Sequence, residues 1–333
     1  MIKKLLKTLV ALSLCLIFLL PNTVSCTAGE PYSEGNGALN ILCTSFAPFD
    51  FARNIVGDTA TVTLLQDGGA DLHNYTPTAA TLEAISRADL FIYIGGVSDE
   101  AWIKDAIRAS GNSDLVTLCL MDFVTPVHAE LENDWSEHEE HDGHTEHESD
   151  HDHSGHDHSS DEHVWTSPRN AKHIVSAISA AVCEISPQNS ELYTQNFESY
   201  SKKLDQLDSQ LTELFSDKQD SLLIFADRFP FVYLMHDYHV PYKAAFSGCS
   251  TEINSSVSTQ VSLIEAVREH NATAILIIEG GSKDLAEAVS AETGCRILAL
   301  NSMQSVSRVD VVAGADYVEI MQGNIEVLKE VFQ

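Results

Sequence analysis

Short runs rich in β-branched residues alternate with segments of helical periodicity from residue 38 onward. The runs form a first set at 39–45, 61–65, 90–94 and 115–118, and a second set at 221–226, 274–279 and 296–300. Strands separated by helices pair in parallel, because the chain must cross over the sheet between one strand and the next. The alternation excludes an all-helical or all-β fold and predicts an α/β chain with two βα lobes, each built on a parallel sheet.

The stretch at 190–215 is the longest helical pattern between the two sets of strands. Its apolar residues recur at helical spacing, and it contains neither Gly nor Pro. We expect a long rigid helix that joins the two lobes. The predicted domains are an N-terminal lobe at 38–168, a linking helical region at 169–219 and a C-terminal lobe at 220–333. Further helices are predicted at 76–87, 258–270, 282–292 and 309–331.

The start of the chain has the layout of a secretion signal. Three lysines precede an apolar run at 9–20, which is too short to span a bilayer. Small residues and Cys26 follow, an arrangement that resembles the bacterial lipobox, in which the cysteine carries a lipid. We predict a lipoprotein signal peptide at 1–25, a lipid on Cys26 and a tether at 26–37, which together place the protein at the outer face of a bacterial cell membrane. A plain cleavable signal is the alternative.

Acidic residues outnumber basic ones by 49 to 19, and the formal net charge is −30. Nucleic-acid binding needs clusters of Lys and Arg against the phosphates, so this composition argues against a nucleic-acid partner. It also argues against adhesion to an anionic membrane through charge alone. A negative field of this kind attracts cations and raises their rate of capture.

Much of the negative charge lies in the segment 130–162, which has 14 acidic residues, eight histidines and neither Lys nor Arg. A segment with so little apolar content cannot pack into a core, so we expect a mobile loop. Its imidazoles and carboxylates can gather around Zn²⁺, whereas the alternative is a solvated acidic loop without a metal. The predicted weak auxiliary ligands are His138, His141, His144, His147, His151, His153, His156 and His158.

Five cysteines lie beyond Cys26, widely spaced and without a Cys-x-x-Cys pair. An odd number at these spacings argues against a disulfide framework and against a four-cysteine zinc site. A single bridge between Cys249 and Cys295 stays open.

Two further histidines stand in strand-to-helix positions outside the acidic segment. His73 lies in Gly-Ala-Asp-Leu-His-Asn-Tyr-Thr-Pro-Thr (69–78), and His163 lies in Asp-Glu-His-Val-Trp-Thr-Ser-Pro (161–168). Loops at the carboxyl ends of strands are where open α/β folds bind ligands. Each histidine by itself is more often a surface or core residue, and the flanking motifs are what favour a binding site.

These motifs resemble those of the zinc and manganese solute-binding proteins of bacterial ABC transporters, the cluster A-I metal receptors. That family carries Gly-x-Asp-Pro-His-x-Tyr-x-Pro-Thr and Asp-Pro-His-Val-Trp-x-Ser-Pro, and each His binds the metal. Leu72 and Glu162 stand here where the family has prolines. The resemblance extends over essentially the whole mature chain, and the acidic His-rich loop is typical of the zinc branch. It implies a metal-receptor type of solute-binding fold with His73 and His163 as metal ligands.

The other ligands that the resemblance implies are altered in this chain. The third position falls on Ala226, which cannot bind a metal, and we predict the adjacent Asp227 as its replacement. Asp227 has two alternative roles, as an ion-pair partner of Arg228 or as a cap on the next helix. The fourth position falls on Asn301, a poor ligand for such a cation. The alternatives for these positions are Glu252, Glu279, His236 and His239.

Two imidazoles, one carboxylate and a water form a four-coordinate site that suits Zn²⁺, whereas Mn²⁺ prefers more oxygen ligands. The leading hypothesis is an extracytoplasmic solute-binding lipoprotein, a monomer and not an enzyme, that captures Zn²⁺ between its lobes. It would deliver the ion to the membrane permease of an ABC transporter and its ATPase. The alternatives are a manganese or iron receptor of the same family, a surface adhesin or metal buffer, and a zinc hydrolase. The chain has no Gly-x-Ser-x-Gly motif, the nucleophile turn of serine hydrolases.

Overall fold

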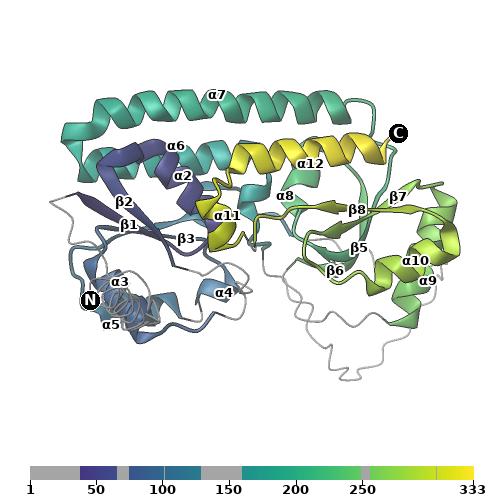
Figure 1. The fold of residues 1–333 in the computed structure, drawn as a ribbon, viewed down its shortest axis with the longest axis horizontal. Helices are drawn as coiled ribbons and strands as arrows, with labels where there is room; N and C mark the ends of the chain where they lie inside the picture. Colours follow the sequence, from purple (N-terminus) through teal and green to yellow (C-terminus); the bar gives the residue numbers. More distant parts are fainter. Residues whose placement is uncertain (1–37, 66–74, 101, 129–159, 249–255, 305) are drawn as a thin grey trace, which may run out of the picture. The chain divides into compact units, whose positions relative to one another are not determined.

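The structure is a computed structural model that describes residues 38–65, 75–100, 102–128, 160–248, 256–304 and 306–333. Two parallel four-stranded sheets form its framework, one in each half of the chain (Figure 1). This confirms the predicted α/β class. Residues Gly37–Gln333 belong to one compact unit, and the domain boundaries placed at 168 and 219 stay predictions. The signal peptide, Cys26 and the tether lie outside the described residues.

The first sheet has the order β2-β1-β3-β4, and every neighbouring pair of strands is parallel. Its strands coincide with the predicted β-branched and apolar runs, whose side chains pack well on a pleated surface. The strands are β1 (Leu39–Cys43), β2 (Ala60–Leu64), β3 (Leu90–Tyr93) and β4 (Val116–Cys119). The helices that connect them are α2 (Phe46–Val56), α3 (Ala79–Arg87), α4 (Val97–Glu100) and α5 (Ile103–Ser110).

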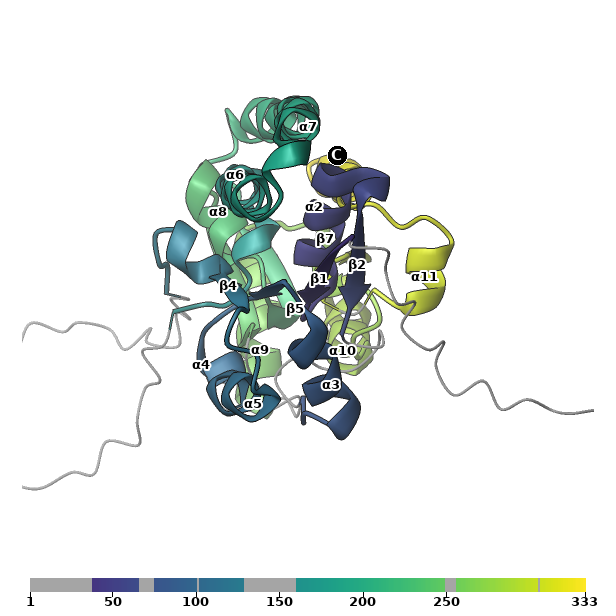
Figure 2. The same cartoon turned by 90° about the vertical axis from the view of Figure 1, so that its left-hand side faces the viewer.

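Two long helices follow this sheet, α6 (Pro168–Ile185) and α7 (Ser190–Phe215). Figures 1 and 2 show α2, α6 and α7 on one face of the first sheet and α3 and α5 on the other. The predicted long helix is confirmed, because α7 is continuous over 26 residues. It packs against α2 and α6 in the first half of the chain, and against α8 (Val232–Tyr238) and α12 (Tyr317–Val331) in the second.

The second sheet repeats the arrangement of the first, with the order β6-β5-β7-β8 and parallel pairing throughout. Side chains alternate across β5, so Leu223 and Phe225 enter a large apolar cluster while Ile224 and Ala226 enter a smaller one. Ala226, at the family's third ligand position, is therefore a core residue. The strands are β5 (Leu223–Phe229), β6 (Tyr242–Ser247), β7 (Ala274–Ile278) and β8 (Arg296–Leu300). The remaining helices are α9 (Val257–Glu269), α10 (Asp284–Thr293) and α11 (Arg308–Val312).

The large apolar cluster extends through both halves of the chain. It contains Ile41 of β1, Leu207 of α7, Leu276 of β7 and Ile325 of α12. Burial of apolar side chains is the main stabilising term in a fold of this kind. The two sheets therefore share one core, as expected for a rigid connection between them.

A buried carboxylate, Asp50 of α2, lies in this connection. Its Oδ1 accepts a hydrogen bond from Arg53 Nε at 2.8 Å, and its Oδ2 accepts from Tyr200 Oη of α7 at 3.1 Å and from the Tyr317 N–H of α12 at 3.2 Å. Burial raises the pKa of Asp50 to about 6, although the neighbouring Arg53 opposes the shift. Asp50 thus ties together helices from both halves.

One predicted helix and one unpredicted strand show how the structure differs from the sequence prediction. The stretch 309–331 was expected as one helix, but the structure divides it into α11 and α12 around Gly314, which has a φ of 98°. Asp316 then caps α12 by accepting hydrogen bonds from the N–H groups of Val318 and Glu319. Strand β6 was not predicted, because its sequence Tyr-Lys-Ala-Ala-Phe-Ser contains no β-branched residue.

None of the described helices combines the length and the apolar character needed to cross a membrane. Within the same part of the chain, the free thiols are Cys43, Cys119, Cys183 and Cys295. Cys249, the partner considered for Cys295, lies outside the described residues.

Candidate metal centre

His163 lies at the end of the acidic segment, close to residue 160, where the described part of the chain resumes. It is followed by a 3₁₀ turn at Val164–Thr166, after which α6 begins. The residue is 1% exposed, and its ring makes an edge contact with Trp165 at a centroid distance of 5.4 Å. Thr166 Oγ1 donates a hydrogen bond to the His163 carbonyl oxygen at 2.8 Å. Packing and hydrogen bonding therefore hold the imidazole in one orientation.

Asp161 binds one nitrogen of the His163 ring. Its Oδ1 lies 2.9 Å from His163 Nδ1 and also accepts a hydrogen bond from the His163 backbone N–H at 2.8 Å. A carboxylate at Nδ1 favours the tautomer with the proton on that nitrogen and directs Nε2 toward a metal. The pair is therefore suited to bind a borderline divalent cation through Nε2. Asp161 was not among the predicted site residues, and its spacing of two residues from His163 is the signal that identifies it.

The second half of the chain contacts this segment at three points. Tyr233 Oη of α8 donates to the Asp161 carbonyl oxygen at 2.9 Å. Trp165 Nε1 donates to the Ser302 carbonyl oxygen at 2.9 Å, and Tyr317 Oη donates to the Trp165 carbonyl oxygen at 2.7 Å. The backbone that carries His163 is therefore fixed against the second sheet and its helices.

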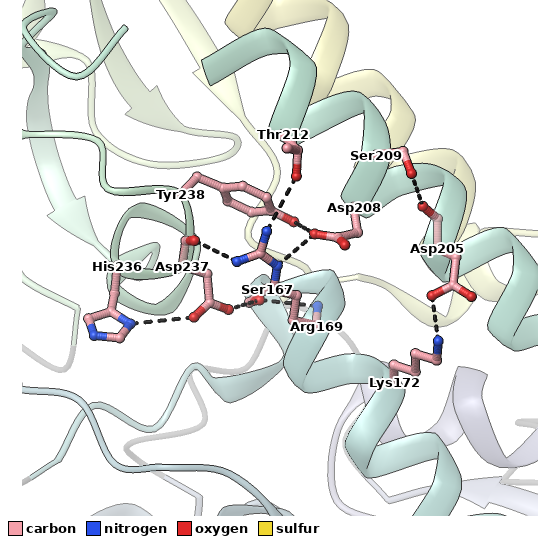
Figure 3. A network of polar contacts seen from close by, with 10 residues as sticks. All are labelled: Ser167, Arg169, Lys172, Asp205, Asp208, Ser209, Thr212, His236, Asp237 and Tyr238. Carbon is pink, nitrogen blue, oxygen red and sulfur yellow. Dashed lines mark hydrogen bonds and ion pairs between the residues drawn. The ribbon is translucent and has the colours of Figure 1, made fainter. Parts of the chain in front are cut away.

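A polar network fixes the far end of the same segment, at the first turn of α6 (Figure 3). Ser167 Oγ donates to the carboxylate of Asp237 at the end of α8. Arg169 donates through Nε to Asp208 of α7 and through Nη1 to the Asp237 carbonyl oxygen, both at 2.7 Å. Its guanidinium also lies over the Tyr238 ring at 4.6 Å, a cation–π contact. These contacts bind α6 to α7 and α8 beside the candidate site.

Gly248, directly after β6, brings the backbone of the second half against His163. A Cβ atom at Gly248 would lie 2.9 Å from His163 Cε1, 3.0 Å from Asp161 Oδ2 and 2.8 Å from the Phe229 carbonyl oxygen. Carbon atoms in contact normally stand farther apart, at about 3.5–4.0 Å. A residue with a side chain does not fit here unless its neighbours move. No feature of the sequence had marked this glycine.

Asp227, the predicted third ligand, is 6% exposed and lies in β5 where its pairing with β6 shifts register. Its Oδ1 accepts from the Arg228 N–H at 2.8 Å, and its Oδ2 accepts from the Ile278 N–H of β7 at 3.1 Å. A Cβ atom at Gly281 would lie 2.1 Å from Oδ2, so this carboxylate is closely enclosed. Burial raises the pKa of Asp227, while the two N–H groups oppose the shift.

Among the described residues, the remaining candidate ligands are either hydrogen-bonded to each other or exposed to solvent. Asn301 follows β8, donates through Nδ2 to Glu279 Oε2 at 2.7 Å and accepts through Oδ1 from the Met303 N–H at 2.8 Å. Glu279 and Asn301 therefore bind each other at the carboxyl ends of β7 and β8. His236 and His239 are exposed, the first on α8 and the second at its C-terminal cap.

Across the ranges that the structure describes, no group of three or more His, Cys, Asp and Glu side chains is placed to hold a metal. His73, Glu252 and the eight histidines of the acidic segment lie outside those ranges, so the pairing of His73 with His163 stays a prediction. The chain just after His73 is described and anchored. The Tyr75 ring packs on Trp102 at a centroid distance of 4.9 Å, and Tyr75 Oη lies 2.7 Å from Thr81 Oγ1 of α3.

Comparison with known proteins assigns the chain to a family. The family model described as zinc-uptake complex component A, periplasmic, matches residues 41–331. The chain is 29% identical over 325 residues to the zinc-binding lipoprotein AdcA of Streptococcus pneumoniae, a match that covers 97% of this chain and 60% of AdcA. It therefore spans less than two thirds of that relative. It is also 29% identical over 306 residues to the high-affinity zinc uptake system protein ZnuA of Bacillus subtilis, covering 92% of this chain and 91% of that protein.

A solved structure shows the same fold. The Zn(II)-bound ZnuA-like domain of Streptococcus pneumoniae AdcA superposes with a TM-score of 0.68 at 26% identity, covering 89% of this chain and 99% of that domain. The family-model match, residues 41–331, contains α7, the His163 segment and the strands of both sheets except the first two residues of β1. The resemblance inferred from the two histidine motifs is thereby confirmed, and the chain belongs to the zinc-uptake complex component A family, the zinc branch of the metal-receptor solute-binding proteins.

Proposed function

We propose that this protein captures Zn²⁺ outside the cytoplasm and delivers it to the permease of an ABC transporter for uptake. The observation that carries the proposal is the buried His163 imidazole, whose Nδ1 is bound by Asp161 in a chain of this family. A carboxylate on the second ring nitrogen is the usual support of a metal-binding histidine. The names of the Streptococcus and Bacillus relatives, a zinc-binding lipoprotein and a zinc uptake protein, support zinc as the cargo.

The proposed ligands are His73, His163 and Asp227, with a water as the fourth. Both Asp227 oxygens already accept backbone hydrogen bonds, but a carboxylate oxygen has a second lone pair that remains available to a cation. Its raised pKa reflects poor solvation, which a bound cation would relieve. Two imidazoles and a carboxylate favour Zn²⁺ over Mn²⁺ or iron, which take more oxygen ligands.

Two further parts of the proposal concern how the protein is anchored and how the ion is first captured. We propose that a lipid on Cys26 anchors the protein, as a monomer, to the outer face of the cell membrane beside the permease and its ATPase. The eight histidines of the acidic segment would form weak auxiliary sites that raise the local concentration of the ion.

The family is one of binding components, and we propose that this chain has no enzyme activity. One His-Glu-x-x-His spacing does occur, at residues 147–151. In zinc hydrolases this motif stands on a helix that places both histidines on one face. Here it lies in the acidic segment, which has almost no apolar residues to bury such a helix.

Zinc titration calorimetry of four proteins tests the proposal. We expect the intact chain to bind one ion tightly and further ions weakly, and a variant without residues 130–159 to keep only the tight site. The double variant His73→Ala, His163→Ala should lose the tight site, whereas the control His236→Ala, His239→Ala, which removes two exposed histidines, should keep it. Tight one-to-one binding by the first double variant would refute the site, and loss of all binding on deletion of the segment would favour a metal buffer.

A further inference from the structure

Val127 and Asp161, on either side of residues 129–159, meet at Tyr233. The Asp161 N–H donates to the Val127 carbonyl oxygen at 3.0 Å, which brings these two parts of the backbone together. Tyr233 Oη accepts from the Val127 N–H at 3.4 Å and donates to the Asp161 carbonyl oxygen at 2.9 Å. The Tyr233 side chain thus binds both Val127 and Asp161.

Tyr233 comes from the opposite half of the chain. It lies on α8, the helix that follows β5, and β5 carries Asp227. The residue is 1% exposed and its ring belongs to the large apolar cluster, so its position is set by core packing. The Tyr233 hydroxyl is therefore held in one position beside the Asp161 carbonyl oxygen.

Asp161 receives this contact through its backbone and orients His163 through its side chain. Its carbonyl oxygen accepts from Tyr233, while its Oδ1 accepts from the backbone N–H of His163 and lies 2.9 Å from His163 Nδ1. A shift of the Asp161 backbone moves its carboxylate by a similar amount. Metal sites need their ligands held to within about 0.5 Å, so such a shift changes the affinity for the ion.

We propose that Tyr233 is a positioning residue of the metal site. Its hydroxyl fixes Asp161, and through Asp161 the imidazole of His163. The ligand geometry is then set by α8 and not by residues 129–159, which lie between Val127 and Asp161 in the sequence. The inference rests on the proposed function, because it takes His163 as a ligand of the ion. It adds that the second half of the chain organises a ligand that the first half supplies.

The test compares Tyr233→Phe with Tyr238→Phe in the full-length protein. The control is matched, since Tyr238 lies on the same helix and its hydroxyl donates to Asp208 Oδ1 at 2.8 Å, so each variant loses one hydroxyl and its hydrogen bonds. Zinc affinity is measured by competition with a chromophoric chelator. Removal of a supporting contact around a ligand costs about 10–100-fold in metal affinity, so we expect about a tenfold weaker Kd for Tyr233→Phe and a change of less than about twofold for Tyr238→Phe.

A second readout separates positioning from a general loss of stability. Long-range ¹H–¹⁵N spectra of the metal-free protein should show His163 with its proton on Nδ1 in the wild type and in Tyr238→Phe. Tyr233→Phe should show a mixture of both tautomers. Unchanged affinity and an unchanged tautomer in Tyr233→Phe would overturn the inference, as would equal losses of affinity in the two variants.

His163→Ala, measured in the same series, separates this inference from the proposed function. If His163→Ala still binds zinc tightly, the proposed ligand set is wrong and the role of Tyr233 is refuted with it. If His163→Ala loses binding while Tyr233→Phe behaves like the wild type, the proposed function stands and the positioning role alone is refuted.

Discussion

The two sheets share one strand order, yet the polar groups associated with them are used in different ways. In the first half of the chain, a carboxylate binds the His163 imidazole and leaves the ring oriented for a ligand. In the second half, Asp227 accepts hydrogen bonds from its own sheet, and Asn301 binds Glu279. The first half thus supplies a preoriented imidazole, which we propose as a ligand, and the second supplies a carboxylate that supports its own strands.

Because of this difference, substitutions in the two halves should differ in their effects on metal binding and on stability. A change at His163 should affect metal binding more than stability, because the packing of the second sheet does not depend on its ring nitrogens. A change at Asp227 should affect both, because its oxygens complete backbone hydrogen bonding between β5 and β7. The comparison therefore predicts that His163 serves the proposed metal site, whereas Asp227 serves both that site and the fold.

The largest expected effect concerns the connection between the two halves. Asp50→Ala removes the acceptor shared by Arg53, Tyr200 and Tyr317, and each donor left without its acceptor costs about 1–3 kcal/mol, so we expect a loss of about 3–5 kcal/mol of unfolding free energy. Urea unfolding measures the loss. Glu83→Ala is the control, because the exposed Glu83–Arg87 pair should contribute less than about 1 kcal/mol. Equal effects in the two variants would show that the shared core does not depend on Asp50.

The next effect tests the double role of Asp227. Asp227→Ala leaves the buried Ile278 N–H and the partly buried Arg228 N–H without this acceptor, and each orphaned group costs about 1–3 kcal/mol. We expect a loss of about 2–4 kcal/mol of unfolding free energy in the metal-free protein, together with weaker zinc binding. His163→Ala should lose zinc binding with a smaller loss of stability. If Asp227→Ala binds zinc as the wild type does, Asp227 serves the fold alone.

Two glycines allow each half of the site to be displaced separately. A Cβ at Gly281 would lie 2.1 Å from Asp227 Oδ2, and one at Gly248 would lie 2.9 Å from His163 Cε1. Overpacking of this kind costs about 1–3 kcal/mol, and we expect Gly281→Ala to lose more stability than Gly248→Ala because its contact is closer. Both should weaken zinc binding in calorimetry.

The control for these substitutions is Gly323→Ala in α12, where an added Cβ meets nothing within 4 Å. It should stabilise the protein by about 0.5–1 kcal/mol, as alanine does in a helix interior. Wild-type zinc affinity in Gly248→Ala would contradict the close approach of the second half to His163.

The smallest effect is a pH dependence that arises in the shared core. The pKa of Asp50 is raised to about 6, so the folded state binds more protons than the unfolded state between about pH 4 and pH 6. Stability from this group therefore rises as the pH falls from 7 to 5, by about 1 kcal/mol. Asp50→Asn should lack this rise, whereas the similarly raised Asp99 remains in both proteins and cancels in the difference. A wild-type slope in Asp50→Asn would place the titration elsewhere.

Most of the fold could be predicted from the sequence, because seven of the eight strands in the described ranges are marked by apolar or β-branched runs. The exception, β6, contains Tyr, Lys, Ala, Phe and Ser, and its residues are only partly buried. Among the described strands it pairs with β5 alone, at the edge of the sheet. Such a strand is defined by its neighbour and not by its own composition.

The candidate site was less accessible to sequence reasoning. Motif spacing identified His163, but the support from Asp161 depends on the turn that folds its carboxylate back onto the ring. Tyr233 and Gly248 lie 70 and 85 residues beyond His163 in the sequence, and only the packing of the second half against the first brings them to it. Asp227 likewise lies at a register shift between β5 and β6 that composition does not reveal, and its bond to Ile278 joins residues that are far apart in the sequence.

The most direct test of the account is a crystal structure of the zinc-loaded protein with anomalous scattering recorded at the zinc edge. We predict one strong peak about 2.0–2.1 Å from His163 Nε2. Asp161 should remain on Nδ1, and His73 and Asp227 should complete the coordination. A strong peak that is not bound by His163, or one found only on the histidines of the acidic segment, would contradict the account.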